Sequence, residues 1–186
     1  MLEPIHEKGR IIEETSHYQG HIYEDVTQIV ETPDHLTVHR DLIKHQPAVA
    51  ILALTPDHQQ VVINREYRVG VNQEVYALPA GLINAGETAE AAAKRELTEE
   101  TGYVVQELHQ MTAIRSSEGM TDEVVTLFWA VIDPAKRQST NFDKDEFVTA
   151  NLVPLTDLID AVQTGVVASA QSVAAVSYFL AFEQNK

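Results

Sequence analysis

The segment Gly81–Tyr103 reads GLINAGETAEAAAKRELTEETGY and carries the clearest pattern in the chain. Thr88 is a residue type that caps helix N-termini, and alanines fill the turns that follow it. Gly102 stands where a residue in the left-handed conformation commonly ends a helix. We therefore predict a helix over 88–101, entered from a loop that glycines bracket.

The same segment concentrates negative charge. On a helix, Glu96 lies beside Glu99 and Glu100, and like charges at spacings of three and four residues destabilise a helix. A divalent cation removes that penalty, and carboxylate oxygens without sulfur or clustered imidazole favour Mg²⁺ or Mn²⁺ over zinc. The local chemistry indicates metal-assisted hydrolysis of a phosphate ester or anhydride.

The spacing of these residues resembles the Nudix box, Gly-x5-Glu-x7-Arg-Glu-U-x-Glu-Glu-x-Gly-U, where U is a bulky apolar residue. Leu97 and Tyr103 fill the two apolar positions. Every fixed position is matched, by Gly81, Glu87, Arg95, Glu96, Glu99, Glu100 and Gly102. The resemblance implies the Nudix fold, an α/β fold with a mixed β-sheet sandwiched between helices.

The resemblance also assigns roles to residues of the box and its entrance. It implies four metal ligands, which are Glu96, Glu99, Glu100 and the backbone carbonyl of Ala80. Gly81, Glu87 and Gly102 would support the loop and the helix. Arg95 would pair with Glu87 and orient the carboxylates, and we include it in the catalytic group. The expected cofactor is Mg²⁺, with Mn²⁺ as the alternative.

The flanks resemble the ADP-ribose pyrophosphatase branch of that family. Asn64–Arg68 (NREYR) is similar to its Arg-Gln-Tyr-Arg segment, and Leu78–Ile83 (LPAGLI) is similar to its Leu-Pro-Ala-Gly entry into the box. The likeness implies that the substrate is a nucleoside diphosphate linked to another moiety, with ADP-ribose cleaved to AMP and ribose 5-phosphate. The candidate substrate-binding residues are Arg68, which we place on the diphosphate, and Arg65, Arg40 and Glu118.

Two positions depart from the branch and leave the substrate open. The branch commonly has Ser-Pro-Gly where this chain has Ser117-Glu118-Gly119, and a glutamate where this chain has Ala77. Another nucleotide sugar or a nucleoside triphosphate therefore remains an alternative substrate. A non-catalytic nucleotide-sugar sensor is an alternative of another class, but such proteins typically lose glutamates of the box.

The general base is expected in the acidic loop 141–148, after the box. Glu146 is the first candidate because it best resembles the loop glutamate of the branch. Asp143 and Asp145 are its rivals in the same loop. Glu99, within the box, is the remaining alternative.

The rest of the chain is consistent with an α/β sandwich. Ala48–Leu54 is a continuous apolar run of strand length, which predicts a strand buried on both faces. Further strands are expected at 61–65, 74–78, 104–108 and 124–132, with helices at 156–162 and 170–183. The segment 124–132 contains Phe128 and Trp129, which are expected in the core or in an interface.

Two regions are expected from the pattern and the resemblance together. Residues 46–186 would form the Nudix hydrolase domain. Residues 1–45, with strands at 27–30 and 36–42, would form a small antiparallel β element. The resemblance implies that this N-terminal element forms a homodimer.

Composition limits the partners. The chain has 28 acidic and 13 basic residues, a net charge of −15, whereas non-specific nucleic-acid binding needs a basic surface. Its longest apolar run is too short to cross a bilayer, and no signal peptide is expected in its charged first ten residues. Cysteine is absent, which fits the reducing cytoplasm, and the eight histidines show no ligand spacing. We expect a cytoplasmic protein with a small-molecule substrate and no nucleic-acid or membrane partner.

Overall fold

The computed structural model describes residues 2–3, 7–141 and 148–184, and these residues divide into two compact units. The first unit contains residues 1–46 and 117–123, and the second contains residues 47–116 and 124–186. The chain therefore passes from one unit to the other three times.

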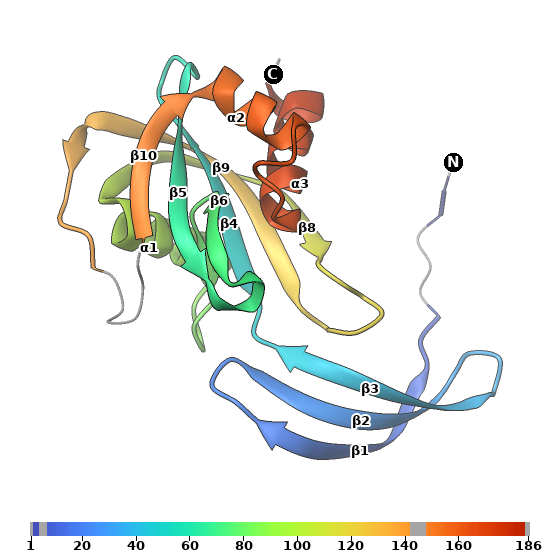
Figure 1. Cartoon of the computed structure of the whole chain (residues 1–186). Coiled ribbons are helices and arrows are strands. Elements are labelled where there is room, and N and C mark those ends of the chain that lie inside the picture. The colour runs from blue at the N-terminus through green and yellow to red at the C-terminus, as the bar shows by residue number, and fades with distance from the viewer. Residues whose placement is uncertain (1, 4–6, 142–147, 185–186) are drawn as a thin grey trace. The chain divides into compact units, whose positions relative to one another are not determined.

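The first unit is a three-stranded antiparallel sheet in the order β1-β2-β3 (Figure 1). Its strands are β1 (Arg10–Gln19), β2 (Tyr23–Glu31) and β3 (Thr37–His45). The segment 117–123 joins this sheet, because Ile43 N–H donates to Met120 O at 2.9 Å and His45 N–H donates to Asp122 Oδ1 at 2.8 Å. Among the described residues of this unit, Val26 is the one that is fully enclosed.

The second unit is built on a mixed sheet in the order β10-β5-β4-β9-β8, with β6 paired to β5 and β7 to β4. Strand β4 runs parallel to β9, and the other pairs are antiparallel. The strands are β4 (Ala48–Leu54), β5 (Gln60–Arg68), β6 (Gln73–Ala77), β7 (Ala80–Leu82), β8 (Tyr103–Arg115), β9 (Val124–Arg137) and β10 (Val148–Pro154). A short 3-10 turn, η1 (Val69–Val71), joins β5 to β6.

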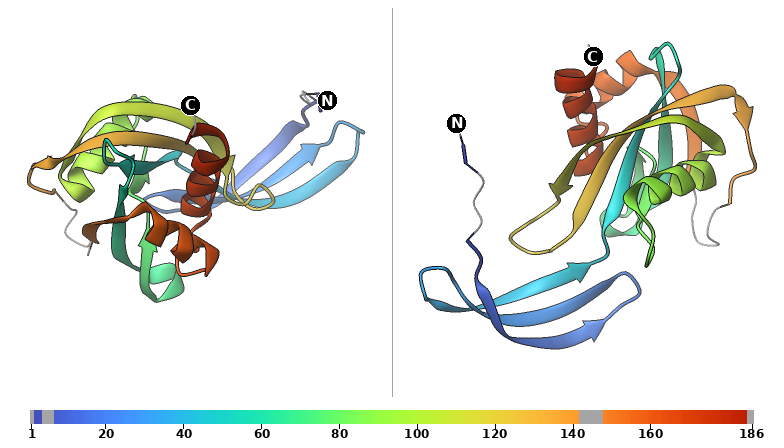
Figure 2. Two further views of the ribbon diagram at one scale, coloured as in Figure 1. Left: turned by 90° about the horizontal axis from the view of Figure 1, so that it is seen from above. Right: turned by 180° about the vertical axis from the view of Figure 1, so that it is seen from behind.

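Helices cover both faces of this sheet (Figure 2). On one face, α1 (Ala89–Thr101) packs Ala92, Ala93 and Leu97 onto the sheet. On the other face lie α2 (Leu155–Gln163), α3 (Ala170–Tyr178) and the π-helical turn η2 (Phe179–Glu183). The predicted mixed sheet between helices, with a small antiparallel element before it, is confirmed.

Strand β4 is the centre of the sandwich, and all seven of its residues are buried. Alternate side chains of a strand point to opposite faces. Ala48, Ala50, Leu52 and Leu54 accordingly enter the core under α2 and α3, while Val49, Ile51 and Ala53 enter the core under α1. The prediction of a strand buried on both faces is confirmed, and it fixes the plane on which α1 rests.

Several boundaries differ from the sequence-based expectation. Strands β8 and β9 run past 108 and 132, and β1, β7 and β10 were not expected at all. The predicted helix 170–183 changes at Phe179 into a π-helical turn. The buried Phe179 ring packs edge-on against Trp129, with 5.7 Å between ring centres. Phe128 is fully buried and Trp129 packs on the core, as expected.

None of the helices among the described residues combines the length and the apolar content that a membrane span requires. The longest, α1, has 13 residues and carries the charged segment described above.

Candidate functional site

Helix α1 begins and ends where the sequence predicted. The Thr88 hydroxyl accepts a hydrogen bond from Ala91 N–H at 3.2 Å, which satisfies one of the backbone donors left open in the first turn. Gly102 ends the helix with φ of 75°, and its N–H donates to Thr98 O. These caps fix the length of the helix and hence the face on which its glutamates gather.

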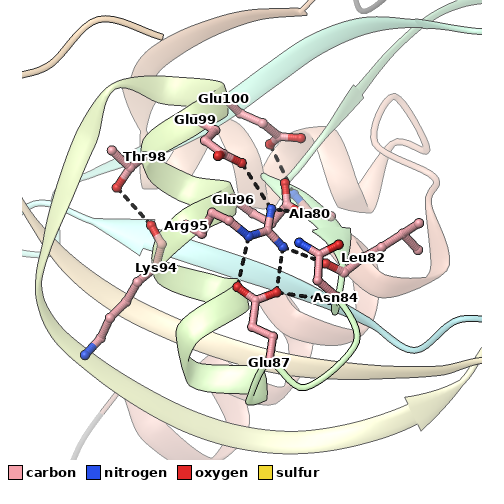
Figure 3. Close-up of polar contacts among 10 residues, drawn as sticks. All are labelled: Ala80, Leu82, Asn84, Glu87, Lys94, Arg95, Glu96, Thr98, Glu99 and Glu100. Atoms are coloured by element: carbon pink, nitrogen blue, oxygen red, sulfur yellow. Dashed lines mark hydrogen bonds and ion pairs between the residues drawn. The ribbon is translucent and has the colours of Figure 1, made fainter. Parts of the chain in front are cut away.

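Arg95 ties α1 to the loop before it (Figure 3). Its Nε donates to Glu87 Oε1 and its terminal nitrogen Nη2 donates to Glu87 Oε2, both at 2.9 Å. The same terminal nitrogen reaches Leu82 O at 2.8 Å, and Glu87 Oε2 also accepts from Asn84 N–H at 3.0 Å. The guanidinium therefore fastens both ends of the loop 82–87 to the helix.

The ionisation of both partners reflects this arrangement. The Arg95 guanidinium, followed by the Asn84 N–H, lowers the pKa of Glu87 to about 2. The hydrogen bonds that Arg95 donates to Glu87, and then those to Glu96 and Glu99, raise the pKa of Arg95. Both groups are therefore charged throughout the physiological range.

The other terminal nitrogen of Arg95 gathers two glutamates of the same helix. Nη1 donates to Glu96 Oε1 at 2.6 Å and to Glu99 Oε2 at 3.0 Å. Because like charges at this spacing repel, a cation between them offsets part of the cost of placing both carboxylates together. Arg95 thus holds two of the predicted metal ligands in one place.

Glu96 lies directly over β7. A side chain at Gly81 would place its Cβ 2.1 Å from the carboxyl carbon of Glu96, far closer than any real contact. The absence of a side chain at position 81 is therefore what allows the Glu96 carboxylate to approach the β7 backbone. The resemblance implied that Gly81 supports the loop. In the structure, its lack of a side chain leaves room for the Glu96 carboxylate.

Glu100 is buried, with 7% of its surface exposed, and it is held by a residue that the sequence analysis did not single out. Asn64 Nδ2, on β5, donates to Glu100 Oε2 at 2.8 Å. Ala80 N–H lies 3.3 Å from the same oxygen. The sequence indicated Asn64 only weakly. It is a polar residue two positions after Val62, on the same face of the strand.

The set of donors fits a hard divalent cation. Glu96, Glu99 and Glu100 bring carboxylate oxygens to one side of α1 beside Ala80, and no sulfur or imidazole lies among them (Figure 3). Within residues 2–3, 7–141 and 148–184, no three acidic or histidine side chains already converge at metal-binding distance. Arg95 binds one oxygen of Glu96 and one oxygen of Glu99.

The predicted substrate arginines of β5 lie on opposite faces of the strand. The pairing of β5 with β6 and with β10 is continuous, so its side chains alternate without a bulge. Arg68 therefore shares the face of Asn64 and pairs with Glu66 at 2.8 Å. Arg65 points to the other face, where it forms an ion pair with Glu74. Of the two, Arg68 is on the face that carries the glutamates of the box.

Two of the remaining candidates for substrate binding, Arg40 and Glu118, belong to the first unit. Arg40 donates to His39 O at 2.8 Å, and Glu118 is exposed in the segment 117–123. Three of the candidates for the general base, Asp143, Asp145 and Glu146, lie outside the described residues. Glu99, the fourth, is described and bound to Arg95, with 37% of its side chain exposed.

Comparison with known proteins gives consistent matches. The model of the NUDIX domain matches residues 44–176. An ADP-ribose pyrophosphatase of Bacillus subtilis is 33% identical over 87% of this chain and 86% of that protein. A methanol dehydrogenase activator of Bacillus methanolicus is 29% identical over the same shares. A GDP-mannose pyrophosphatase of Citrobacter koseri is 27% identical over 74% of this chain and 79% of that protein.

The fold has a match among solved structures as well. A crystal structure of an ADP compounds hydrolase superposes with a TM-score of 0.81 and covers 98% of each chain at 19% sequence identity. At that identity the match concerns the fold alone. It extends over the N-terminal sheet as well as the mixed sheet, since nearly the whole chain is covered.

Proposed function

Because this chain belongs to the Nudix family of hydrolases, we propose that it hydrolyses a nucleoside diphosphate linked to a second moiety in a Mg²⁺-dependent reaction. ADP-ribose is the proposed substrate, and AMP and ribose 5-phosphate are the proposed products. Water adds across the P–O–P bridge, so that each product keeps one of the two phosphates. Mn²⁺ is the alternative metal.

One observation carries the proposal, namely the gathering of three glutamates around Arg95, Gly81 and Asn64. Each carboxylate is held by contacts that stability alone does not require, since glutamates on a solvated helix face need no such partners. A cluster of carboxylates held close together is typical of a site that binds a cation. A purely structural role for α1 leaves this arrangement without a reason.

The proposed division of labour follows from the contacts. Glu96, Glu99, Glu100 and the carbonyl of Ala80 would hold the metal, which when bound supplies charge neutralisation for the diphosphate and activation of water. Arg68 would bind the far phosphate, after releasing Glu66. Glu87 and Arg95 keep the loop against the helix. Glu146, with Asp143, Asp145 and Glu99 as alternatives, would align the attacking water.

The choice of substrate rests on the relatives. The Bacillus subtilis relative is named for ADP-ribose and covers most of both chains. The Citrobacter koseri relative is named for GDP-mannose, so another nucleotide sugar is the alternative. A nucleoside triphosphate is a second alternative, and a sensor that binds without turnover is an alternative of another class.

The test is a substrate panel with the purified protein and Mg²⁺, containing ADP-ribose, UDP-glucose, GDP-mannose, NADH, diadenosine polyphosphates and dGTP. Phosphate release after addition of a phosphatase reports cleavage, and chromatography identifies the nucleotide product. We expect ADP-ribose to be cleaved fastest, with AMP as the product. Faster cleavage of another diphosphate would overturn ADP-ribose as the proposed substrate. If no compound of the panel were cleaved, the result would support the non-catalytic sensor.

Two variants of α1 make this test specific. Glu100→Gln removes one charge from the cluster, and we expect it to abolish turnover while the melting temperature stays near that of the unchanged protein. Glu90→Gln is the matched control, because Glu90 lies on the same helix but is exposed. Equal activity of both variants would contradict the assignment of the metal site.

We further propose that the N-terminal sheet forms a homodimer. A sheet needs cover on at least one face to be stable in water. Among the described residues of the N-terminal sheet, Val26 is the one that is buried. Ile11, Ile12, Tyr18 and Tyr23 are exposed on β1 and β2, with Ile11 at 56%. A second copy of the same sheet supplies a self-complementary apolar cover.

Sedimentation equilibrium tests the dimer. We expect twice the 20.7 kDa mass of the chain, and a shift towards the single mass in Ile11→Lys. Thr37→Lys is the matched control, since it adds the same charge at an already polar, exposed position of β3. A single-chain mass for the unchanged protein would overturn the dimer.

We also propose that the protein is cytoplasmic, in keeping with its lack of cysteine.

A further inference from the structure

Asn64 is a buried amide on β5, where it lies between Val62 and Glu66 on one face of the strand. Its exposed fraction is 2%, and Val62, two residues earlier on the same face, is in the core under α1. Its partners on the neighbouring strands are alanines, Ala77 on β6 and Ala150 on β10. Burying an amide in such surroundings is unfavourable unless its polar atoms are bonded, so the position needs a reason.

The amide meets that condition on one side only. Nδ2 donates to Glu100 Oε2 at 2.8 Å. A carboxylate can only accept, so the nitrogen and not the oxygen of the amide must face Glu100. The opposite atom, Oδ1, is buried and finds no hydrogen-bond partner among residues 2–3, 7–141 and 148–184. The protein leaves a buried acceptor unmatched there in order to keep a donor on Glu100.

Two donors converge on the same oxygen of Glu100. Ala80 N–H, from β7, approaches Oε2 at 3.3 Å, while Asn64 approaches it from β5. The two donors restrain the position of Oε2, and both come from strands rather than from α1. Residues outside the box therefore help to hold this glutamate in place.

From this geometry we infer that Asn64 is a positioning residue, which sets the Glu100 carboxylate for the metal through its side-chain amide. The inference rests on the proposed function, since it concerns the same metal site. Asn64 touches neither the metal nor the substrate in this role and acts through Glu100 alone. Residues that orient a metal ligand in this way commonly contribute 10- to 100-fold to metal affinity.

A double-mutant cycle on metal affinity tests the inference. The dissociation constant of Mn²⁺ is measured by calorimetric titration, without substrate, for four proteins: the unchanged chain, Asn64→Ala, Glu100→Gln and the double variant. We expect Asn64→Ala to weaken Mn²⁺ binding by about 10- to 100-fold. In the Glu100→Gln background the same change should have no further effect, because the residue through which it acts is already altered.

A matched control and a second variant guard against loss of folding. Ser172→Ala also removes a buried polar group of the same unit, one that accepts from Leu78 N–H at 3.0 Å on the other face of the sheet. It should leave Mn²⁺ affinity unchanged, whatever it does to the melting temperature. Should Asn64→Ala not fold, Asn64→Ser keeps a polar group that is too short to reach Glu100 and is expected to weaken Mn²⁺ binding in the same way.

The possible results separate the inference from the proposed function. A loss of affinity from Asn64→Ala that is equal in both backgrounds would show a general structural effect and overturn the inference. An unchanged affinity in Asn64→Ala, beside a weakened one in Glu100→Gln, would overturn the inference and leave the proposed function standing. If Glu100→Gln itself binds Mn²⁺ normally, the proposed metal site fails and the inference fails with it.

Discussion

Arg95 and Glu87 face one another with two parallel hydrogen bonds of 2.9 Å each, one from Nε and one from a terminal nitrogen. The pair joins the middle of α1 to the end of the loop that leads into it. Since the same guanidinium also holds Glu96 and Glu99, the loop, the helix and the carboxylate cluster form one connected network. Disturbing Glu87 is therefore expected to affect more than one contact.

The pKa of Glu87 makes the strength of this pair depend on pH. Its pKa is lowered from 4.5 to about 2 in the folded protein, chiefly by Arg95. The stabilisation is therefore fully present above about pH 4.5 and is lost as the pH falls towards 2. We expect the difference in urea midpoint between the unchanged protein and Glu87→Gln to be constant near pH 7 and to shrink between pH 4.5 and pH 2. A difference that persists unchanged through that range would contradict the assignment.

Gly81→Ala should separate metal binding from stability. The new methyl group would collide with the Glu96 carboxylate, which is the end of a flexible side chain and can swing away at little cost. We therefore expect a melting temperature close to that of the unchanged protein, together with a clear loss of Mn²⁺ affinity and of turnover. Gly70→Ala is the control, since no atom lies within 4 Å of its added methyl group. Normal Mn²⁺ binding by Gly81→Ala would show that Glu96 is not a ligand.

The alternation of β5 predicts different consequences for its two arginines. Arg68→Ala removes a guanidinium from the face that carries Asn64, and we expect the KM for the diphosphate substrate to rise by roughly 10- to 100-fold, as for loss of a hydrogen bond to a charged group. Arg65→Ala, on the opposite face with Glu74, should change KM much less. Steady-state kinetics of both variants decide this, and a larger effect at Arg65 would reverse the placement of the substrate.

Thr88 caps α1, and its replacement has a defined cost. Thr88→Ala removes the acceptor for Ala91 N–H, and we expect the free energy of unfolding to fall by about 1 kcal/mol. Thr88→Ser keeps a hydroxyl at the same position and should restore most of that loss. Urea unfolding at neutral pH measures both, and equal stability of the alanine and serine variants would exclude capping as the reason for this threonine.

The parts of the fold that the sequence predicted well are those with a buried face. The seven apolar residues of β4 and the capped helix α1 each have a local pattern that burial imposes. Strand β1 could not be found in this way, because all ten of its residues are exposed and no face alternates. Strand β10 has no fully buried residue and ends at Pro154, so its pattern is equally weak.

The candidate site divides along the same line. The residues of the box lie close together in the sequence, from the end of β7 through one loop and α1, so a local pattern can reveal which of them share a helix face. Asn64 reaches Glu100 from a strand that is distant in the sequence, and no local pattern connects the two. Likewise, the opposite directions of Arg65 and Arg68 depend on the unbroken pairing of β5 with two neighbours, which a single sequence does not reveal.

The parallel pairing of β4 with β9 has a consequence for biosynthesis. During translation, β4 and α1 leave the ribosome well before β9, so Ile51 and its neighbours wait for the strand that will place Phe128 beside them. In that interval the most apolar strand of the protein has an open edge, which is the condition under which nascent chains aggregate. Until β9 is synthesised, the growing chain therefore depends on whatever shields the open edge of β4.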